Sequence, residues 1–219
     1  MSTPKKKKQK RARSDEAKEQ RRHAILQTAR RLFEGQSYET LTVDLVARHS
    51  KLAKGTVYLY FQSKEAIFLE LLLNELQAWL AWLVAPLERL QKGNVSGVAE
   101  LLATSIAERP SLRRLLALLH STLERNVDYD TVRSFKLRGA EAMQPAATRL
   151  EACLPQLGIG EGVRLLMHLH ALVVGVGQVS DESAVVRQVL ADPQLAVFRV
   201  DFTAELRELL ELILLGYYR

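Results

Sequence analysis

Apolar residues recur at helical spacing along almost the whole chain, and this periodicity is what most restricts the fold. Between residues 25 and 33 they fall at i, i+1, i+4, i+7 and i+8, which makes one stripe on a helix: Ile25, Leu26, Ala29, Leu32 and Phe33. Leu and Ala are frequent, whereas the 219 residues include only eleven Gly and six Pro. This composition favours helix over strand. We therefore predict an all-α protein.

The second part of the chain is a succession of such helices. We expect them at about 64–89, 97–108, 111–126, 129–156 with a kink at Pro145, 160–179 and 200–217. The segment 160–179 is apolar nearly all round, and one side of 200–217 is apolar as well. A body of this size can hardly bury both segments internally, so we expect them to form the interface of a homodimer.

Several classes of protein are disfavoured by what the sequence contains. The single cysteine, Cys153, excludes an intramolecular disulfide and a thiolate zinc site, and a lone cysteine is more often inert than a redox sensor. The most apolar stretch, 165–179, is short and interrupted by His168, His170 and Gln178, so we expect no membrane span and a cytoplasmic location. An enzyme is the main alternative class. Without a Gly-rich phosphate loop or a nucleophile motif, we expect no catalytic residue, cofactor or metal.

Charge is distributed unevenly between the two parts of the chain. Residues 1–62 contain fifteen basic and six acidic residues, so that the rest of the chain carries −3 of the overall +6. Seven of these basic residues lie in the segment 1–14, MSTPKKKKQKRARS. A basic front end on a mildly acidic body is typical of a module that binds a polyanion, and nucleic acid is the partner it suggests.

The front part predicts a helix-turn-helix. We expect a disordered basic tail at 1–14, a DNA-binding domain at 15–63 and a helical dimerisation domain at 64–219, for which a family resemblance implies effector binding as well. Within 15–63, a first helix ends near Gly35, Thr42 caps a short second helix, and Ser63 caps the long helix that follows. The run AKGTVYLYF between them could be a strand by propensity, but no partner strand exists nearby, so it is predicted to be the third helix.

This region resembles the tetracycline-repressor-like (TetR) family of bacterial regulators. The resemblance covers residues 20–68 by motif, in YETLTVDLVARHSKLAKGTVYLYFQSKEAIF with Gly35 ahead of it, and the rest only by helical organisation. It implies a homodimer whose amino-terminal domains enter successive major grooves of a pseudo-palindromic operator. It also implies a helical body that binds a small molecule and changes the spacing of those domains.

The resemblance assigns DNA-binding roles to seven positions. Three match residues that contact phosphates at helix amino ends or through a phenol, namely Thr42, Tyr60 and Lys64. Four would lie toward the floor of the groove, where a glycine permits close backbone approach, namely Lys54, Gly55, Thr56 and Tyr58. Aromatic packing inside a small helical domain is the alternative for the two tyrosines.

Three positions depart from the family pattern. Lys51 stands in the turn where glycine is common, so that either it adopts a positive φ or the turn differs. Ala53 replaces the usual Ser or Thr cap, which removes about 1 kcal/mol of local helix stabilisation. Leu59 occupies a position that is often polar, and it could contact a thymine methyl or nothing.

The body suggests an effector, although less specifically. Its Leu and Trp content favours an apolar or aromatic small molecule, with Trp79, Trp82, His120 and Glu124 as candidate ligand-binding residues. His120 and Glu124 are four apart and could equally be a surface pair. For His168 and His170 we expect structural roles, since residues two apart on a helix cannot hold one metal together. We therefore expect a ligand-responsive transcriptional regulator, a repressor in most such families. A dimeric adaptor that binds DNA without sequence preference is the alternative.

Overall fold

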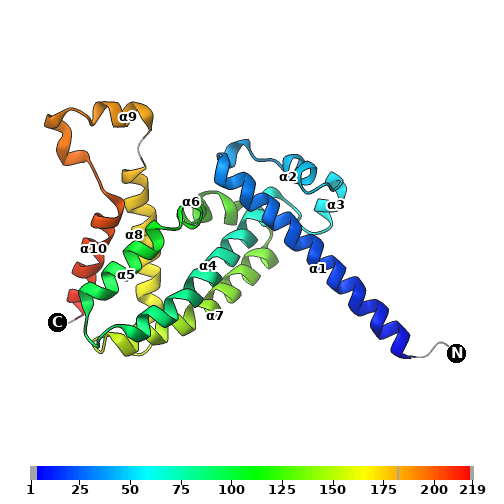
Figure 1. Ribbon diagram of the computed structural model, residues 1–219, viewed down its shortest axis with the longest axis horizontal. Helices are drawn as coiled ribbons and strands as arrows, with labels where there is room; N and C mark the ends of the chain where they lie inside the picture. Colours follow the sequence, from blue (N-terminus) through cyan, green and yellow to red (C-terminus); the bar gives the residue numbers. More distant parts are fainter. Residues whose placement is uncertain (1–3, 182, 218–219) are drawn as a thin grey trace.

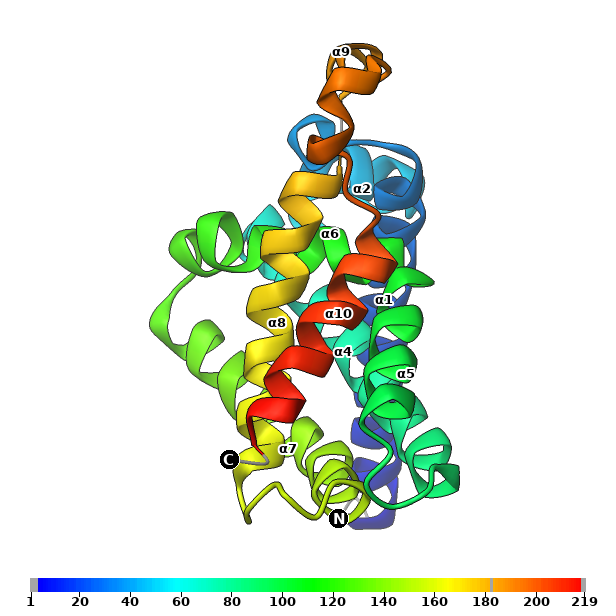
Figure 2. The ribbon, with the colours of Figure 1, turned by 90° about the vertical axis from the view of Figure 1, so that its left-hand side faces the viewer.

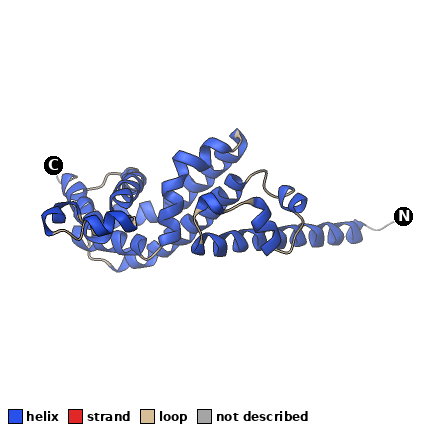
Figure 3. Cartoon of the chain, turned by 90° about the horizontal axis from the view of Figure 1, so that it is seen from above, coloured by secondary structure: helices blue, strands red, loops and turns tan. Residues whose placement is uncertain are grey.

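The computed structural model describes residues 4–181 and 183–217, with side chains from Glu16 onward. This part of the chain consists of helices and connecting turns, without a strand (Figure 1, Figure 3). The prediction of an all-α protein is confirmed, and the segment AKGTVYLYF is helical rather than extended over its first half.

The amino-terminal part is a small three-helix unit, which we call the head. It consists of the second half of α1 (Pro4–Gly35), the short 3₁₀ turn η1 (Tyr38–Thr40), α2 (Val43–His49) and α3 (Lys54–Tyr58). α2 and α3 pack beside the carboxyl end of α1, while the amino half of α1 projects away from the molecule as a single long helix (Figure 1, Figure 3).

The start of α1 differs from the expected disorder of residues 1–14. The helix begins at Pro4 and runs without interruption into the head, while residues 1–3 lie outside the described residues. Lys, Arg, Gln and Ala have high helix propensity, and proline is well accommodated in a first helical turn. An extension of an existing helix also needs no new nucleus, which is the unfavourable step of helix formation.

The body contains the six long helices that the periodicity predicts. Their bounds are α4 (Lys64–Arg89), α5 (Val95–Ala107), α6 (Pro110–Leu118), α7 (Tyr129–Cys153), α8 (Glu161–Ser180) and α10 (Phe202–Gly216). α4 packs along α7, and α5 packs along α10. α8 contacts α6, α7 and α10, and it lies beside α10 on one face of the molecule (Figure 2).

Two parts of the body differ from the prediction. The expected helix 111–126 is regular only to Leu118, and continues as a π-helical turn, η2 (Leu119–Leu123), and a 3₁₀ turn, η3 (Glu124–Asn126). The segment between α8 and α10 contains the unpredicted α9 (Ala184–Val189) and η4 (Pro193–Phe198). Neither buries a residue in this chain, which explains why no apolar stripe indicated them.

The two longest apolar helices are core elements of this body. α4 and α8 are long and apolar enough to cross a membrane by length and composition alone. In the structure α4 instead buries one face against α7, and α8 buries part of its surface against its neighbours. At its amino end, α8 meets α7 in backbone contact, because a Cβ atom at Gly162 would lie only 2.4 Å from the carbonyl oxygen of Ala147.

Candidate functional site

The second helix of the head begins as the sequence predicts. The Oγ1 atom of Thr42 accepts a hydrogen bond from the backbone N–H of Leu45 at 3.1 Å, so Thr42 is the amino cap of α2. Asp44 lies in the first turn and pairs with Arg48 at 3.0 Å. Thr42 itself is exposed, and the remaining free N–H groups of this end give it a positive potential toward solvent.

Lys51, in the turn after α2, adopts the positive φ that was one of the two alternatives from the sequence, with a value of 56°. The N–H of Leu52 donates to the carbonyl of Ala47 at 2.9 Å, and the N–H of Lys51 donates to the carbonyl of Arg48 at 3.1 Å. These two bonds make a Schellman ending, in which the left-handed residue is usually glycine. Lys51 therefore occupies the position that glycine usually has in this ending, with a positive φ that is strained for a residue with a side chain.

The third helix presents its polar and aromatic residues outward while a single buried residue anchors it. Val57 is fully buried in the head, whereas Lys54, Gly55 and Tyr58 are exposed. Thr56 is half buried, and Leu59 is 80% exposed. As the sequence suggests, Ala53 occupies the cap position without a side-chain hydrogen bond. Within the described residues, the side chains of Lys54 and Tyr58 make no hydrogen bond, so they are available to a partner.

Lys64 and Tyr38 join the head to the start of α4. The Oγ atom of Ser63 caps α4 by accepting from the N–H of Ala66. The Lys64 ammonium donates to the carbonyl of Tyr38 at 3.1 Å and lies 3.9 Å from the centre of its ring. The phenol of Tyr38 donates to Glu65 at 2.9 Å, and burial together with this bond raises the pKa of Tyr38. Lys64 is thus held at a helix amino end, with its charge near the surface.

Tyr60 lies in a different environment from Tyr58. It is half buried and lines a cleft between the head and the body, together with Asp128, Thr131 and Arg138. The two tyrosines of AKGTVYLYF are therefore not equivalent. Tyr58, which is 44% exposed, is the more accessible to a large ligand such as DNA.

Ion pairs connect the head to the body through α4. Glu70 accepts two hydrogen bonds from Arg138 of α7, at 2.8 and 3.0 Å, and one ion pair from Arg22 of α1 at 2.9 Å. Burial opposes ionisation of Glu70, but these two guanidinium groups outweigh it and lower the pKa of the carboxyl. A second pair, Arg30 with Glu75 at 3.2 Å, also links α1 to α4.

Arg114 of α6 closes the carboxyl end of α1. Its guanidinium donates to the carbonyls of Phe33 and Gln36 at 2.8 and 2.7 Å and stacks 4.1 Å from the Phe33 ring centre. The last carbonyls of a helix have no partner inside the helix, so Arg114 satisfies groups that would otherwise depend on water. The head therefore contacts the body at both α4 and α6.

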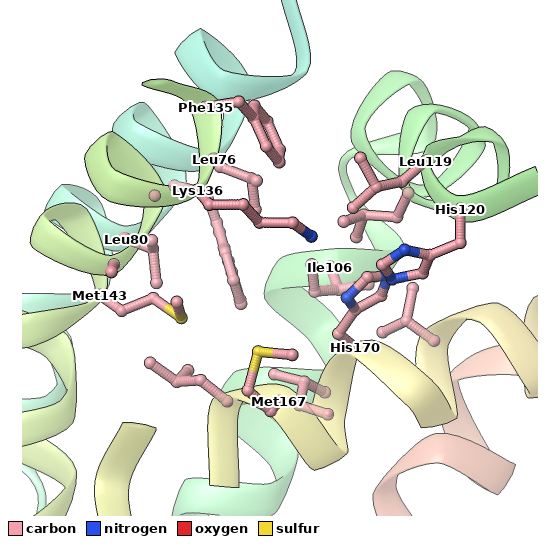
Figure 4. Close-up of a pocket in the computed structure, with 17 residues that line it drawn as sticks. Leu76, Leu80, Ile106, Leu119, His120, Phe135, Lys136, Met143, Met167 and His170 are labelled. Atoms are coloured by element: carbon pink, nitrogen blue, oxygen red, sulfur yellow. The ribbon is translucent and has the colours of Figure 1, made fainter. Parts of the chain in front are cut away.

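The body encloses a cavity of about 130 Å³ between five helices and the η2 turn (Figure 4). Most of its lining is apolar: Leu76, Trp79, Leu80, Ile106, Leu116, Leu119, Phe135, Gly139, Ala140, Met143, Leu166, Met167, Leu169 and Val173. The nitrogen-bearing side chains other than Trp79 are at one end, where His120, Lys136 and His170 approach one another. A mostly apolar pocket with a few convergent polar groups is typical of a small-molecule site.

The cavity includes two of the four residues that the sequence suggested for a ligand. Trp79 and His120 line it, and the Trp79 indole also donates to Ser105 at 3.0 Å. Trp82, one turn further along α4, is 43% exposed and lies under the Arg109 guanidinium instead. Glu124 is placed behind the cavity, where it pairs with His120 and Lys136.

Sequence reasoning missed Lys136 and gave His170 a structural role. Lys136 lies between Phe135 and Leu137 in a stretch that carries no recognisable motif. The separation of the two histidines was correct, since His168 faces a groove between α8 and α10 while His170 faces the cavity. In the described residues, no three His, Cys, Asp or Glu side chains gather to hold a metal ion. Cys153 is buried, and burial raises the pKa of its thiol, as in unreactive cysteines.

α8 and α10 lie side by side on one face of the molecule (Figure 2). Both helices have large apolar side chains that are exposed to solvent. The exposed apolar residues of these two helices are Met167, Val179, Leu212 and Leu215. The neighbouring α9 and η4 add Val185, Val186, Val189, Val197 and Phe198. Large exposed apolar side chains on neighbouring helices favour an interaction surface.

The fold and these sites define a helix-turn-helix protein with a helical body that encloses a small-molecule cavity. Family comparison agrees with this description along the chain. "Bacterial regulatory proteins, tetR family" matches residues 25–71, and "Tetracyclin repressor-like, C-terminal domain" matches residues 73–219. The chain belongs to the tetR family of bacterial regulatory proteins, as the motif in residues 20–68 indicates.

Curated relatives match part of this chain in sequence. The HTH-type transcriptional regulator HbdR of Aromatoleum sp. is 37% identical over 79 residues, which are 33% of this chain and 34% of the relative. The regulator EthR of Mycolicibacterium smegmatis is 42% identical over 52 residues, 24% of either chain. The chain thus spans about a third or less of the curated relatives it matches.

Solved structures extend the likeness to the whole fold. A TetR-family regulator from Mesorhizobium loti has a TM-score of 0.53 at 17% identity, covering 90% of this chain and 95% of that one. A TetR/AcrR-family regulator from Thermobifida fusca has a TM-score of 0.51 at 19% identity, covering 91% and 99%. At these identities the likeness concerns the fold alone.

Proposed function

We propose that this protein is a ligand-responsive transcriptional repressor of the cytoplasm that binds a pseudo-palindromic DNA operator as a homodimer. The observation that carries the proposal is the outward row of Lys54, Gly55 and Tyr58 on a short helix anchored by Val57. Together with Thr56, this row enters the major groove, while Thr42, Tyr60 and Lys64 contact phosphates.

The dimer forms through α8 and α10. Their exposed apolar residues, among them Leu212 at 60% exposure, suit a helix-pair interface, and α9 with η4 extends the same apolar surface. A two-fold axis between the bodies places the two heads on one side of a DNA duplex, about one helical turn apart.

The effector acts through the contacts between body and head. Arg138 lies next to Gly139 of the cavity wall and pairs with Glu70, which also pairs with Arg22 of the head. Arg114 lies two residues before Leu116 of the cavity wall and caps α1. A ligand that fits the cavity in only one arrangement of α6 and α7 therefore favours one position of the head. It shifts the equilibrium between the head positions, and with it DNA binding, by the ratio of its own affinities for the two arrangements.

Selection from a genomic library tests the DNA-binding part of the proposal. The purified full-length protein is incubated with fragments of genomic DNA at near-physiological salt, and the retained fragments are sequenced. We expect enrichment of a short inverted repeat whose half-sites are one helical turn apart. Retention that depends on salt but not on sequence would contradict the repressor and favour a dimeric adaptor.

Light scattering of a charge variant tests the dimer. Leu212→Glu places a carboxylate in the proposed interface and should produce monomers at concentrations where the wild type is dimeric. Leu137→Glu is the matched control, because Leu137 is also an exposed leucine but lies on α7. A Leu212→Glu protein that stays dimeric would place the interface elsewhere.

A further inference from the structure

The size of the cavity suits a compact molecule, and its polar end is open to solvent at His120 and Lys136. Its volume is about 130 Å³, close to that of an engineered apolar cavity of about 150 Å³ that binds benzene. Ring-sized apolar surface is available along Leu80, Ile106 and Met143, which approach from three different helices (Figure 4). A single aromatic ring fills such a space.

The polar end of the cavity contains an unsatisfied group. The Nε2 atom of His170 is buried and has no hydrogen-bond partner. The His170 ring stacks on that of His120 with the ring centres 5.2 Å apart, and Lys136 extends its ammonium toward both (Figure 4). Buried polar atoms are almost always hydrogen-bonded to protein or water, so Nε2 of His170 is the group at this end for which a polar ligand atom would be a partner.

The charges at this end are already balanced. Lys136 forms an ion pair with Glu124, and the same carboxylate lies 3.0 Å from Nδ1 of His120. Burial and the neighbouring His120 lower the pKa of His170, so the imidazole is neutral at neutral pH. A bound anion would therefore meet the Glu124 carboxylate without a spare positive charge, and the two negative charges would repel each other.

A hydroxyl group suits this end better than a carboxylate. A neutral imidazole has one N–H and one lone pair, and either can be at Nε2. A hydroxyl both donates and accepts, so it satisfies Nε2 in either tautomer, whereas a carboxylate only accepts. The apolar wall then surrounds the ring that carries the hydroxyl.

We propose that the cavity binds an uncharged monocyclic phenol, with its ring among Leu80, Ile106 and Met143 and its hydroxyl hydrogen-bonded to Nε2 of His170. This inference rests on the proposed function, because it names the class of effector that the repressor would respond to. His170 is then the residue that selects a hydroxyl-bearing ring, and Trp79 is part of the apolar wall around that ring.

Three ligands of similar size test the chemistry. Binding of p-cresol, toluene and benzoate to the full-length protein is measured by isothermal titration calorimetry at pH 7.5. We expect p-cresol to bind about two- to tenfold more tightly than toluene, the worth of one neutral hydrogen bond. Benzoate should bind at least about tenfold more weakly than p-cresol, because its charge is not compensated.

A pair of histidine variants assigns the effect to one atom. His170→Phe should bring the ratio of p-cresol to toluene affinity close to one, while toluene binding shows that the cavity is intact. His168→Phe, two residues away in the groove between α8 and α10, should keep the wild-type ratio. A wild-type ratio in His170→Phe, tighter binding of benzoate than of p-cresol, or no saturable binding of p-cresol would each overturn the proposal.

Operator binding is measured separately, so that the two proposals can fail independently. Saturable p-cresol binding by a protein that selects no inverted repeat would support the phenol site and contradict the repressor. Selection of an inverted repeat by a protein that binds none of the three compounds would support the repressor and contradict the phenol site. If both hold, p-cresol should release the selected operator fragment from wild type at lower concentration than from His170→Phe.

Discussion

The head and the body present their functional residues in opposite ways. In the head, the proposed DNA-binding residues lie between Thr42 and Lys64 in the sequence, and Lys54, Gly55 and Tyr58 project into solvent from a helix held by Val57. In the body, the cavity is assembled from α4, α5, α6, η2, α7 and α8, and its walls are mostly buried. A substitution in a surface site on a local motif affects little beyond that residue. A substitution in a cavity between helices also affects how the surrounding elements pack.

Substitution of a charged residue at the contact between head and body should lower the free energy of unfolding more than such a substitution elsewhere in either region. Glu70→Gln removes the carboxylate that pairs with both Arg22 and Arg138, and leaves two guanidinium groups without their partner. We expect a loss of about 2–3 kcal/mol in the free energy of unfolding, because breaking a buried ion pair strands the remaining charges. Urea denaturation measures this.

The matched control for this prediction is Glu88→Gln on the same helix. Glu88 pairs with Arg149 at 2.6 Å, but both side chains are nearly half exposed. A loss below about 0.5 kcal/mol is expected for such a surface pair. If the two variants are equally stable, the head and the body are not joined through Glu70.

Within the head, Tyr58 and Lys64 should separate specificity from general affinity. Tyr58→Ala should reduce operator affinity about tenfold and nonspecific affinity much less, because Tyr58 projects toward base edges. Lys64→Ala should weaken both alike and reduce the salt slope of log K by about one unit. Fluorescence anisotropy on operator and random duplexes, over a range of salt, measures both. An unchanged salt slope would remove Lys64 from the phosphate contacts, and equal losses for Tyr58→Ala would place it on the wrong face.

The body should respond to pH through His170. Its pKa in the folded protein is lowered, mainly by burial, so the unfolded chain binds the proton more tightly. The resulting stability is fully present above the model-peptide value of about 6.5 and is lost as pH falls through the lowered value. Thermal unfolding from pH 7.5 to 5 should therefore show a decline that is smaller in His170→Phe. Parallel curves would mean that His170 does not contribute.

The smallest expected effect concerns the turn before the third helix. Lys51→Gly relieves the positive φ of 56° in the Schellman ending of α2. We expect a gain of about 0.5–1 kcal/mol in stability, since only glycine adopts this conformation without strain. Lys51→Ala keeps the strain and should show no such gain, and equal stability of the two variants would mean that the turn is not strained.

The contrast between head and body also explains what the sequence could reveal. Thr42, Ser63 and the Lys51 turn act over a few residues, so capping rules and spacing located them. Trp79 and His120 were found because unusual residue types stand out in a leucine-rich helix. Lys136 and His170 could not be assigned, since their positions depend on how α7 and α8 cross. Arg114 reaches α1 from far along the chain, which no local pattern encodes.

The glycine at the start of α8 allows this helix to contact the backbone of α7 directly. At Gly162 the two backbones touch, and any side chain there would collide with Ala147. The cavity-lining residues of α8 begin at Leu166 and end at Val173, all on one side of that point. α8 is therefore fixed near its amino end by the backbone contact with α7. If a ligand displaced α8 at the cavity, the contact at Gly162 would hold the amino end, and the far end near Ser180 would move the most.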